Sequence, residues 1–77
     1  MAISRKRALE RLEGLAPQVE EHLTKIEADP ESEVVNHWKK EVLAWLSQMD
    51  AAVANVGKRT GAMWLRKIEE WRTRLEK

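Results

Sequence analysis

The spacing of the apolar residues constrains the fold of this chain more than any other feature. In three segments they recur at alternating intervals of three and four residues, which places them on one side of an α-helix. The first two stripes are Leu9, Leu12, Ala16, Val19, Leu23 and Ile26, and then Val35, Trp38, Val42, Trp45, Met49, Ala52 and Val56, with Val34, Leu46 and Val53 widening the second. The third is Trp64, Ile68, Trp71 and Leu75. Each segment therefore predicts an amphipathic helix, whose apolar side needs a partner to cover it.

The apolar stripe changes phase between the second and third segments. A single helix continuing from the second segment would present Arg59 and Arg66 on its apolar side. Gly57 can take the left-handed backbone conformation that ends a helix, and Thr60 can cap a new one. The phase change across residues 57–61 therefore predicts a break between two helices.

Sequence signals also mark the other helix ends. Ser4 is a suitable N-cap for the first helix, because its hydroxyl oxygen can accept a backbone hydrogen bond. Residues 29–32 indicate a stop and a restart, with Asp29 or Ser32 as N-cap and Pro30 in the first helical turn. The expected helices span residues 4–28, 31–55 and 60–76.

Pro17 falls inside the first helical segment, with Gly14 as a second weak point. Proline lacks a backbone N–H and crowds the carbonyl four positions earlier, which here belongs to Glu13. The stripe nevertheless keeps its phase through Pro17, and neither Gly14 nor Leu15 offers a side-chain cap for a fresh helix. We therefore expect one helix, kinked near Pro17.

The three segments together predict an all-α fold, an antiparallel up-down-up three-helix bundle forming a single domain over residues 1–77, because short connections favour antiparallel neighbours. A chain of 77 residues buries only a modest fraction of its unfolded surface, so its stability margin should be small. The sequence has no cysteine, which excludes disulfides and thiolate metal sites. Association with a second copy or with a partner is the remaining source of additional stability.

All four aromatic residues are tryptophans. Folding the chain at its two connections places Trp45 opposite the small Ala16 and level with Trp71, so we expect these two indoles in the core. Trp38 lies level with the end of the third helix and Trp64 near the second connection, so both are expected to be partly exposed. Exposed tryptophan is common at hot spots of protein interfaces, which makes Trp38 and Trp64 the candidate interface residues.

A net charge of +1 conceals a segregated charge distribution. Residues 1–17 carry four cations against two acids, residues 18–33 carry six acids against one lysine, and residues 57–77 carry seven cations against three acids. An up-down-up bundle would bring the start of the chain beside the second connection. The cations expected there form a candidate contact for nucleic acid or another anion: Arg5, Lys6, Arg7, Arg11, Lys58 and Arg59. A solvated charged face is the alternative interpretation.

Acids and bases are expected to neutralise one another at the opposite end. The acids cluster around the first connection and the bases near the end of the third helix, in agreement with the helix dipoles. The acids are Glu27, Asp29, Glu31 and Glu33, and the bases are Arg72, Arg74 and Lys77.

No motif in the sequence predicts catalysis or a cofactor. His22 and His37 fall at a similar level on facing helices, but both lie off the apolar stripes, so we expect surface histidines and no metal site. Residues 57–61 lack the phosphate-loop pattern, because Ala52 and Arg59 stand where glycine and a hydroxyl residue are required. We therefore expect no enzyme activity and no cofactor.

Hydrophobic patterning also bears on location. The chain has neither the uninterrupted apolar core of a signal peptide nor an apolar run approaching the ~20 residues that span a bilayer. A cytoplasmic location is therefore expected. The third segment combines tryptophans with cations, but Glu69, Glu70 and Glu76 argue against contact with a membrane surface.

The sequence supports two functional hypotheses. The first is a small non-enzymatic helical interaction module that acts by self-association or by docking on a protein, through apolar surface that includes Trp38 or Trp64. The alternative is binding of nucleic acid or another anion through the basic residues at the start of the chain and the second connection. A helix-turn-helix outline fits the sequence, but its turn is not diagnostic.

Overall fold

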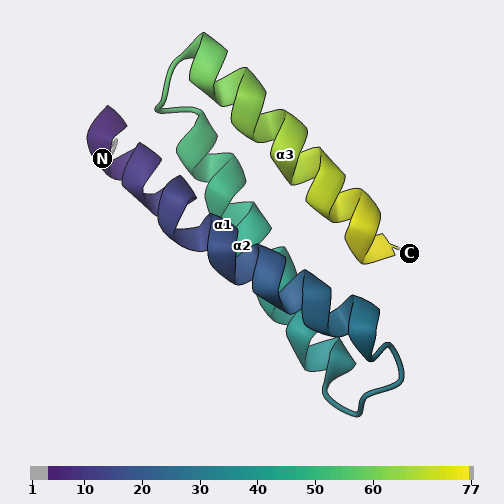
Figure 1. Ribbon diagram of the computed structural model, residues 1–77. Coiled ribbons are helices and arrows are strands. Elements are labelled where there is room, and N and C mark those ends of the chain that lie inside the picture. Colours follow the sequence, from purple (N-terminus) through teal and green to yellow (C-terminus); the bar gives the residue numbers. More distant parts are fainter. Residues whose placement is uncertain (1–3, 77) are drawn as a thin grey trace.

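The computed structural model describes residues 4–76, which form three helices (Figure 1). α1 spans Arg5–Ala28, α2 spans Val35–Val53 and α3 spans Lys58–Glu76. They pack around a common core, and no strand occurs in this part of the chain, so the all-α three-helix fold is confirmed. Within residues 4–76, no helix combines the length and the hydropathy that a membrane-spanning segment requires.

Contacts between distant residues define how the helices lie along one another. Arg5 lies against Gly57, just before α3. Further along α1, His22 contacts Glu41, so residue numbers fall along α2 as they rise along α1. α3 begins at the end of the bundle where α1 begins (Figure 1). The molecule is elongated, measuring 39 × 21 × 16 Å along its principal axes.

α1 begins at the predicted cap and runs unbroken through its proline. Ser4 has an extended backbone, and its Oγ accepts a hydrogen bond from the backbone N–H of Arg7 at 3.2 Å, which confirms the N-cap. The helix continues to Ala28 with Pro17 inside it, so one helix occupies this segment instead of two. The bend that we expect near Pro17 stays a prediction.

α2 begins at Val35, later than predicted. The backbone N–H of Ser32 donates to the carbonyl of Asp29, and that of Val35 donates to the carbonyl of Ser32, each at 3.2 Å. Both bonds join residues three apart and therefore close turns instead of an α-helix. The N-cap is Val34, which makes no side-chain capping bond, so the expectation of an Asp29 or Ser32 cap is wrong. Pro30 consequently lies in the turn.

The phase change of the apolar stripe corresponds to a break between α2 and α3, as predicted. α2 ends at Val53, and Gly57 has a φ of 89°, which residues with a side chain rarely adopt. The carbonyl of Gly57 accepts a hydrogen bond from the backbone N–H of Gly61 at 2.8 Å, and α3 begins at Lys58. Thr60 therefore lies inside the first turn and, contrary to expectation, does not cap the helix.

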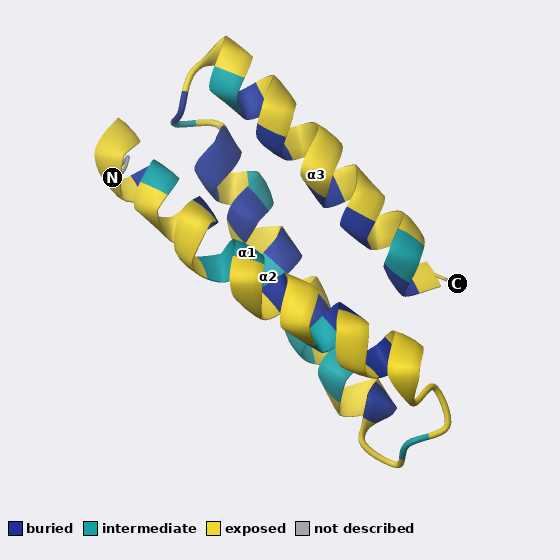
Figure 2. Ribbon diagram, viewed as in Figure 1, coloured by how far each residue is buried: buried dark blue, intermediate teal, exposed yellow. Residues whose placement is uncertain are grey.

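A single cluster of buried side chains lies between the helices (Figure 2). The third stripe is buried, since none of its apolar residues is more than 8% exposed, although Trp64 was expected to be partly exposed. All three helices contribute side chains to the centre of the core, α3 through Ile68. The largest fully buried ones are Leu12, Leu23, Leu46, Met49, Ile68, Val19 and Val42.

The tryptophans divide between core and surface differently from the prediction. Trp64 is 5% exposed, whereas Trp38 and Trp45 are half-buried. The indole of Trp45 stands edge-on to the ring of His22, with centroids 4.7 Å apart. The expectation of a core Trp45 and an exposed Trp64 is therefore wrong. α2 is rotated slightly relative to the predicted stripe, so that Leu46, which has no exposed surface, lies in the core while Trp45 packs against its edge.

Candidate functional site

Six exposed cations gather at the end of the bundle where α1 and α3 begin. We call them the basic pole: Arg5, Lys6, Arg7, Arg11, Lys58 and Arg59. The guanidinium of Arg5 lies against the α2–α3 connection, because its Nη2 is 3.1 Å from where a Cβ on Gly57 would stand. The two chain segments that supply the predicted cations are therefore brought together in space.

The basic pole has no internal counter-charge. Within residues 4–76, none of its six side chains makes an ion pair, and the first turns of α1 and α3 contain no acid. Cations at a helix start oppose the helix dipole, at a cost of about 0.3–1 kcal/mol each at the surface. In the unbound protein, both the mutual repulsion of these cations and the dipoles of α1 and α3 are therefore destabilising.

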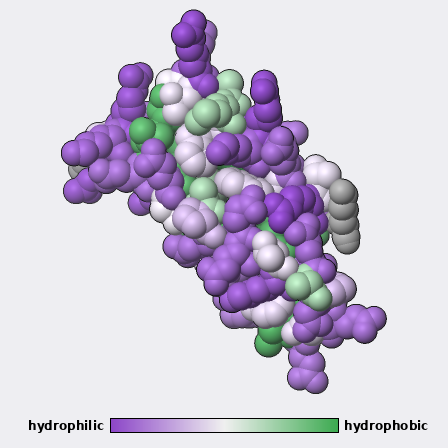
Figure 3. All heavy atoms as spheres, viewed as in Figure 1, coloured by the Kyte–Doolittle hydropathy of each residue, from purple (hydrophilic) through white to green (hydrophobic). Residues whose placement is uncertain are grey.

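An apolar groove of about 410 Å³ adjoins the basic pole. It lies between the end of α2 and the start of α3, with Lys58 at its edge, and its other lining residues are Val53, Ala54, Gly57, Gly61, Ala62 and Leu65. Figure 3 shows the same combination, with apolar surface among hydrophilic side chains at this end of the molecule. The groove and the cations therefore form one composite surface.

Gly61 explains part of the shape of this groove. A Cβ at position 61 would come within 3.3 Å of Cγ1 of Val53, so Gly61 lets α3 approach α2 closely. Ala54 and Ala62 are exposed, and Leu65 leaves 45% of its surface accessible. Sequence reasoning missed this groove because Leu65 lies off the third apolar stripe. The cluster of small residues around the phase change was the available signal.

Trp64, a predicted interface residue, lies in the core. It is 5% exposed, and its indole Nε1 is buried without a hydrogen-bond partner among the described residues. Nζ of Lys67 lies 5.1 Å from the ring centroid, a cation–π distance. An indole enclosed in this way is not available as a surface anchor. The other predicted interface residue, Trp38, keeps part of its surface accessible.

Arg74 joins the last turn of α3 to α1. Its Nη1 donates to both carboxylate oxygens of Glu20, at 2.9 and 3.1 Å, and its Nη2 and Nε donate to Glu27 at 2.7 and 3.2 Å. The indole Nε1 of Trp71 donates to Oε1 of Glu20 at 2.7 Å. Hydrogen bonds to Glu27 and Glu20 raise the pKa of Arg74 above its ordinary value. This network stabilises the contact between α1 and α3.

Charge neutralisation near the first connection is less complete than predicted. Of the four acids expected to be paired, Glu27 bonds to Arg74, whereas Arg72 bonds to Asp50 of α2. The other three acids make no ion pair within residues 4–76, and Lys77 lies outside the described residues. We call these three acids the acidic turn: Asp29, Glu31 and Glu33.

Acid is expected to weaken the α1–α3 contact through Glu20. The Trp71 N–H, followed by the Arg74 guanidinium, stabilises the carboxylate and holds the pKa of Glu20 below the ordinary glutamate value. Such a group stabilises the fold above its unfolded pKa, about 4.3, and that contribution disappears as the pH falls through the lower folded value. Glu20→Gln should therefore reduce the acid-dependent loss of stability by up to about 1 kcal/mol, a modest amount because Glu20 is 51% exposed.

Urea unfolding at a series of pH values from neutral to strongly acidic would measure this effect. Glu10→Gln is the matched control, because Glu10 is exposed and makes no ion pair among the described residues. Parallel stability curves for wild type and Glu20→Gln would contradict the role assigned to Glu20.

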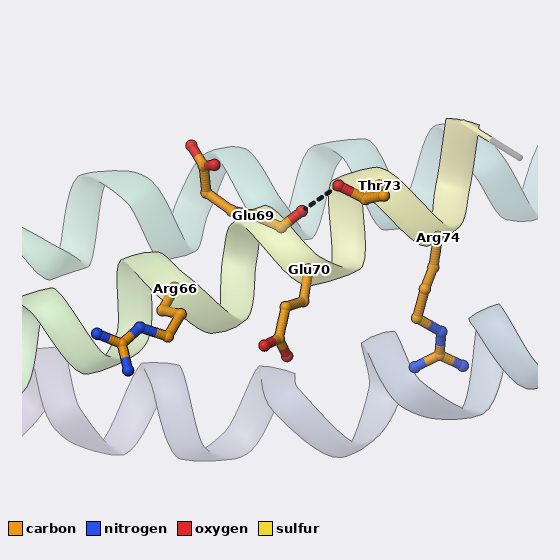
Figure 4. Close-up of a pocket in the computed structure, with 5 residues that line it drawn as sticks. All are labelled: Arg66, Glu69, Glu70, Thr73 and Arg74. Atoms are coloured by element: carbon orange, nitrogen blue, oxygen red, sulfur yellow. Dashed lines mark hydrogen bonds between the residues drawn. The ribbon is translucent and has the colours of Figure 1, made fainter.

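The hollow shown in Figure 4 lies over the same α1–α3 contact. It measures about 470 Å³, and Arg66, Glu70 and Arg74 extend from α3 toward α1 within it. The hydroxyl of Thr73 donates to the backbone carbonyl of Glu69 at 3.0 Å. The hollow is therefore lined by charged side chains. Thr73 is already hydrogen-bonded within α3, and Arg74 is already bonded to α1.

Two histidines meet at one carboxylate between α1 and α2. Oε2 of Glu41 lies 3.1 Å from Nε2 of His22, and Oε1 lies 2.5 Å from Nε2 of His37. His37 is exposed as expected, whereas the side chain of His22 is only 17% exposed, so His22 is not a surface histidine. In residues 4–76, no group of three or more His, Cys, Asp or Glu side chains is arranged to hold a metal ion. The cluster instead links α1 to α2.

Comparison with known proteins gives no relative from which a role could be transferred: no family model, no curated protein and no solved structure matches the chain. The chemistry of the basic pole and its groove is therefore the basis for a functional proposal.

Proposed function

We propose that this chain is a small non-enzymatic interaction module that docks onto acidic protein surfaces through the basic pole. The proposal is carried by one observation: six exposed cations from two distant segments meet at one end without an ion pair in residues 4–76. Their repulsion and their position at helix starts oppose folding of the free chain. An acidic partner would relieve that repulsion, which supports a role in binding.

The groove beside the basic pole supports a protein partner over a nucleic acid. Its lining is mostly apolar or small, and Leu65 is 45% exposed there. A protein helix or turn can present acids and an apolar side chain together, whereas a nucleic-acid backbone presents phosphates and sugars. Binding of nucleic-acid phosphate is the second candidate, because the same six cations would favour it.

The apolar part of the proposed contact differs from the one expected from the sequence. Trp64 is enclosed, whereas its neighbours Met63 and Leu65 are 50% and 45% exposed, and Leu65 lines the groove. Trp38 lies on the first half of α2, away from the basic pole. Self-association through Trp38 stays a prediction that no contact in the structure supports.

Charge reversal in the basic pole is expected to weaken binding of an acidic probe. The probe is a fluorescent peptide of glutamates and leucines that forms an amphipathic helix, titrated into the protein and followed by anisotropy. Lys58→Glu with Arg59→Glu should weaken its binding about tenfold or more, because like charges would then face each other. Lys40→Glu with Arg66→Glu changes the net charge equally at exposed sites outside the basic pole and should have little effect.

A labelled mixed-sequence DNA duplex, titrated in parallel, separates the two candidates. The duplex would be the favoured partner if it bound more tightly than the peptide and if the logarithm of its binding constant fell steeply and linearly with the logarithm of the salt concentration. That result would reject the protein proposal. Equal losses for both double variants would show that only overall charge matters, and would also reject docking through the basic pole.

A further inference from the structure

The end of the molecule opposite the basic pole carries the complementary chemistry. The acidic turn lies in the connection between α1 and α2, and all three of its acids are exposed and without an ion pair in residues 4–76. This connection forms the far end of the elongated bundle, beyond the end of α3 (Figure 1). One chain therefore displays unneutralised cations at one end and unneutralised acids at the other.

An exposed apolar side chain accompanies the acids. Val34 directly follows Glu33 and is 45% exposed, although it belongs to the apolar side predicted for this segment. The groove at the other end has the matching pattern, because small and apolar walls adjoin Lys58. Acids beside a protruding valine thus complement cations beside an apolar groove, both in charge and in polarity.

We propose that a second copy of this chain occupies the groove, with its acidic turn against the basic pole and its Val34 in the groove. The inference rests on the proposed docking through the basic pole and names the occupant. Its support is the charge complementarity between the two ends of the same molecule, which is strengthened where water is partly excluded.

The other charges near the acidic turn leave it available for this contact. Lys39 and Lys40 follow on α2, but Lys39 is half-buried and lines a hollow that also contains Glu27 and Arg74. Lys40 is exposed, so two lysines without an ion pair among the described residues stand against the three acids of the turn. Arg74 is occupied by Glu20 and Glu27.

Joining opposite ends of identical molecules makes the contact heterologous. Each bound copy leaves one free basic pole and one free acidic turn, so association continues into head-to-tail chains instead of stopping at a symmetric dimer. Because the contact is mainly electrostatic, it should weaken strongly at about 1 M salt, where the screening length falls to about 3 Å.

A charge-swap experiment by sedimentation velocity tests the proposal. Wild-type protein, from micromolar to millimolar concentration at low salt, should show an average mass that rises with concentration. Lys58→Glu with Arg59→Glu, and separately Glu31→Lys with Glu33→Lys, should each associate about tenfold or more weakly. The first pair lowers the charge of the basic pole from +6 to +2, and the second changes the charge of the acidic turn from −3 to +1. Mixing the two double variants should restore association, since each then offers the end that the other lacks.

Matched single variants test the apolar part of the contact. Val34→Ser should weaken association several-fold, whereas Leu43→Ser, at a 51% exposed leucine away from the acidic turn, should not. Circular dichroism verifies that each variant is folded. A mixture that stays monomeric, or equal effects of the two serine variants, would overturn the inference. Monomeric wild type that still binds the glutamate–leucine peptide would reject only the second copy as occupant, whereas loss of peptide binding too would reject docking through the basic pole.

Discussion

Leu46→Ala is expected to lower the free energy of unfolding by about 2–5 kcal/mol, because it removes a fully buried side chain and leaves a cavity. A domain of 77 residues has a total stability of roughly 4–12 kcal/mol, so the substitution would remove a large share of it. Urea unfolding followed by tryptophan fluorescence measures the change. The four tryptophans lie on α2 and α3 and report on the packing of both helices.

Leu43→Ala on the same helix is the matched control. Leu43 is 51% exposed, and leucine and alanine have similar helix propensities, so its substitution should change stability by no more than about 0.5 kcal/mol. The pair therefore isolates the effect of burial. If both variants lost the same stability, the rotation of α2 described above would be wrong.

Pro17→Ala is expected to stabilise the protein by about 2 kcal/mol. Proline in a helix interior costs about 3 kcal/mol relative to alanine, because it lacks the N–H and crowds the preceding turn. Alanine also makes the unfolded chain more flexible than proline does, which offsets up to about 1 kcal/mol of the gain in stability. Pro17 is exposed, so its removal costs little packing. Thermal and urea unfolding should both show the increase.

Pro30→Ala supplies a control of opposite sign. Pro30 lies in the α1–α2 connection, where its ring interrupts no helix, so only the effect on the unfolded chain remains. Stability should fall by about 0.4–1 kcal/mol. A loss of stability in Pro17→Ala as large as that in Pro30→Ala would mean that the proline is well accommodated in α1, and would argue against a bend there.

Some predictions from local sequence were confirmed, whereas the caps expected at Asp29 or Ser32 and at Thr60 were wrong. Ser4 caps α1, and the chain breaks between α2 and α3 at the phase change. Each of these features is decided by residues within a turn or two of one another. Gly57 shows the same principle, because its φ of 89° needs only the absence of a side chain.

The candidate site was predictable only in part. The six cations were identified from their positions in sequence and from the expected bundle, and Arg5 does lie against Gly57. The groove was missed because its shape depends on the close approach of Gly61 to Val53, which no periodicity reveals. The unpaired state of the acidic turn was also missed, since Arg72 bonds to Asp50 instead.

Apolar periodicity and local caps are enough to predict three amphipathic helices, the start of α1 and the separation of α2 from α3. The rotation of α2 about its axis depends on packing with the other helices, since Leu46 and Trp45 are adjacent and both fit an apolar stripe. Packing also determines which charges are neutralised, because the bond from Trp71 to Glu20 joins residues 51 positions apart. The physical reason is the same in both cases. Periodicity sets the apolar and polar sides of a helix, whereas its rotation and its ion pairs depend on the helices packed against it.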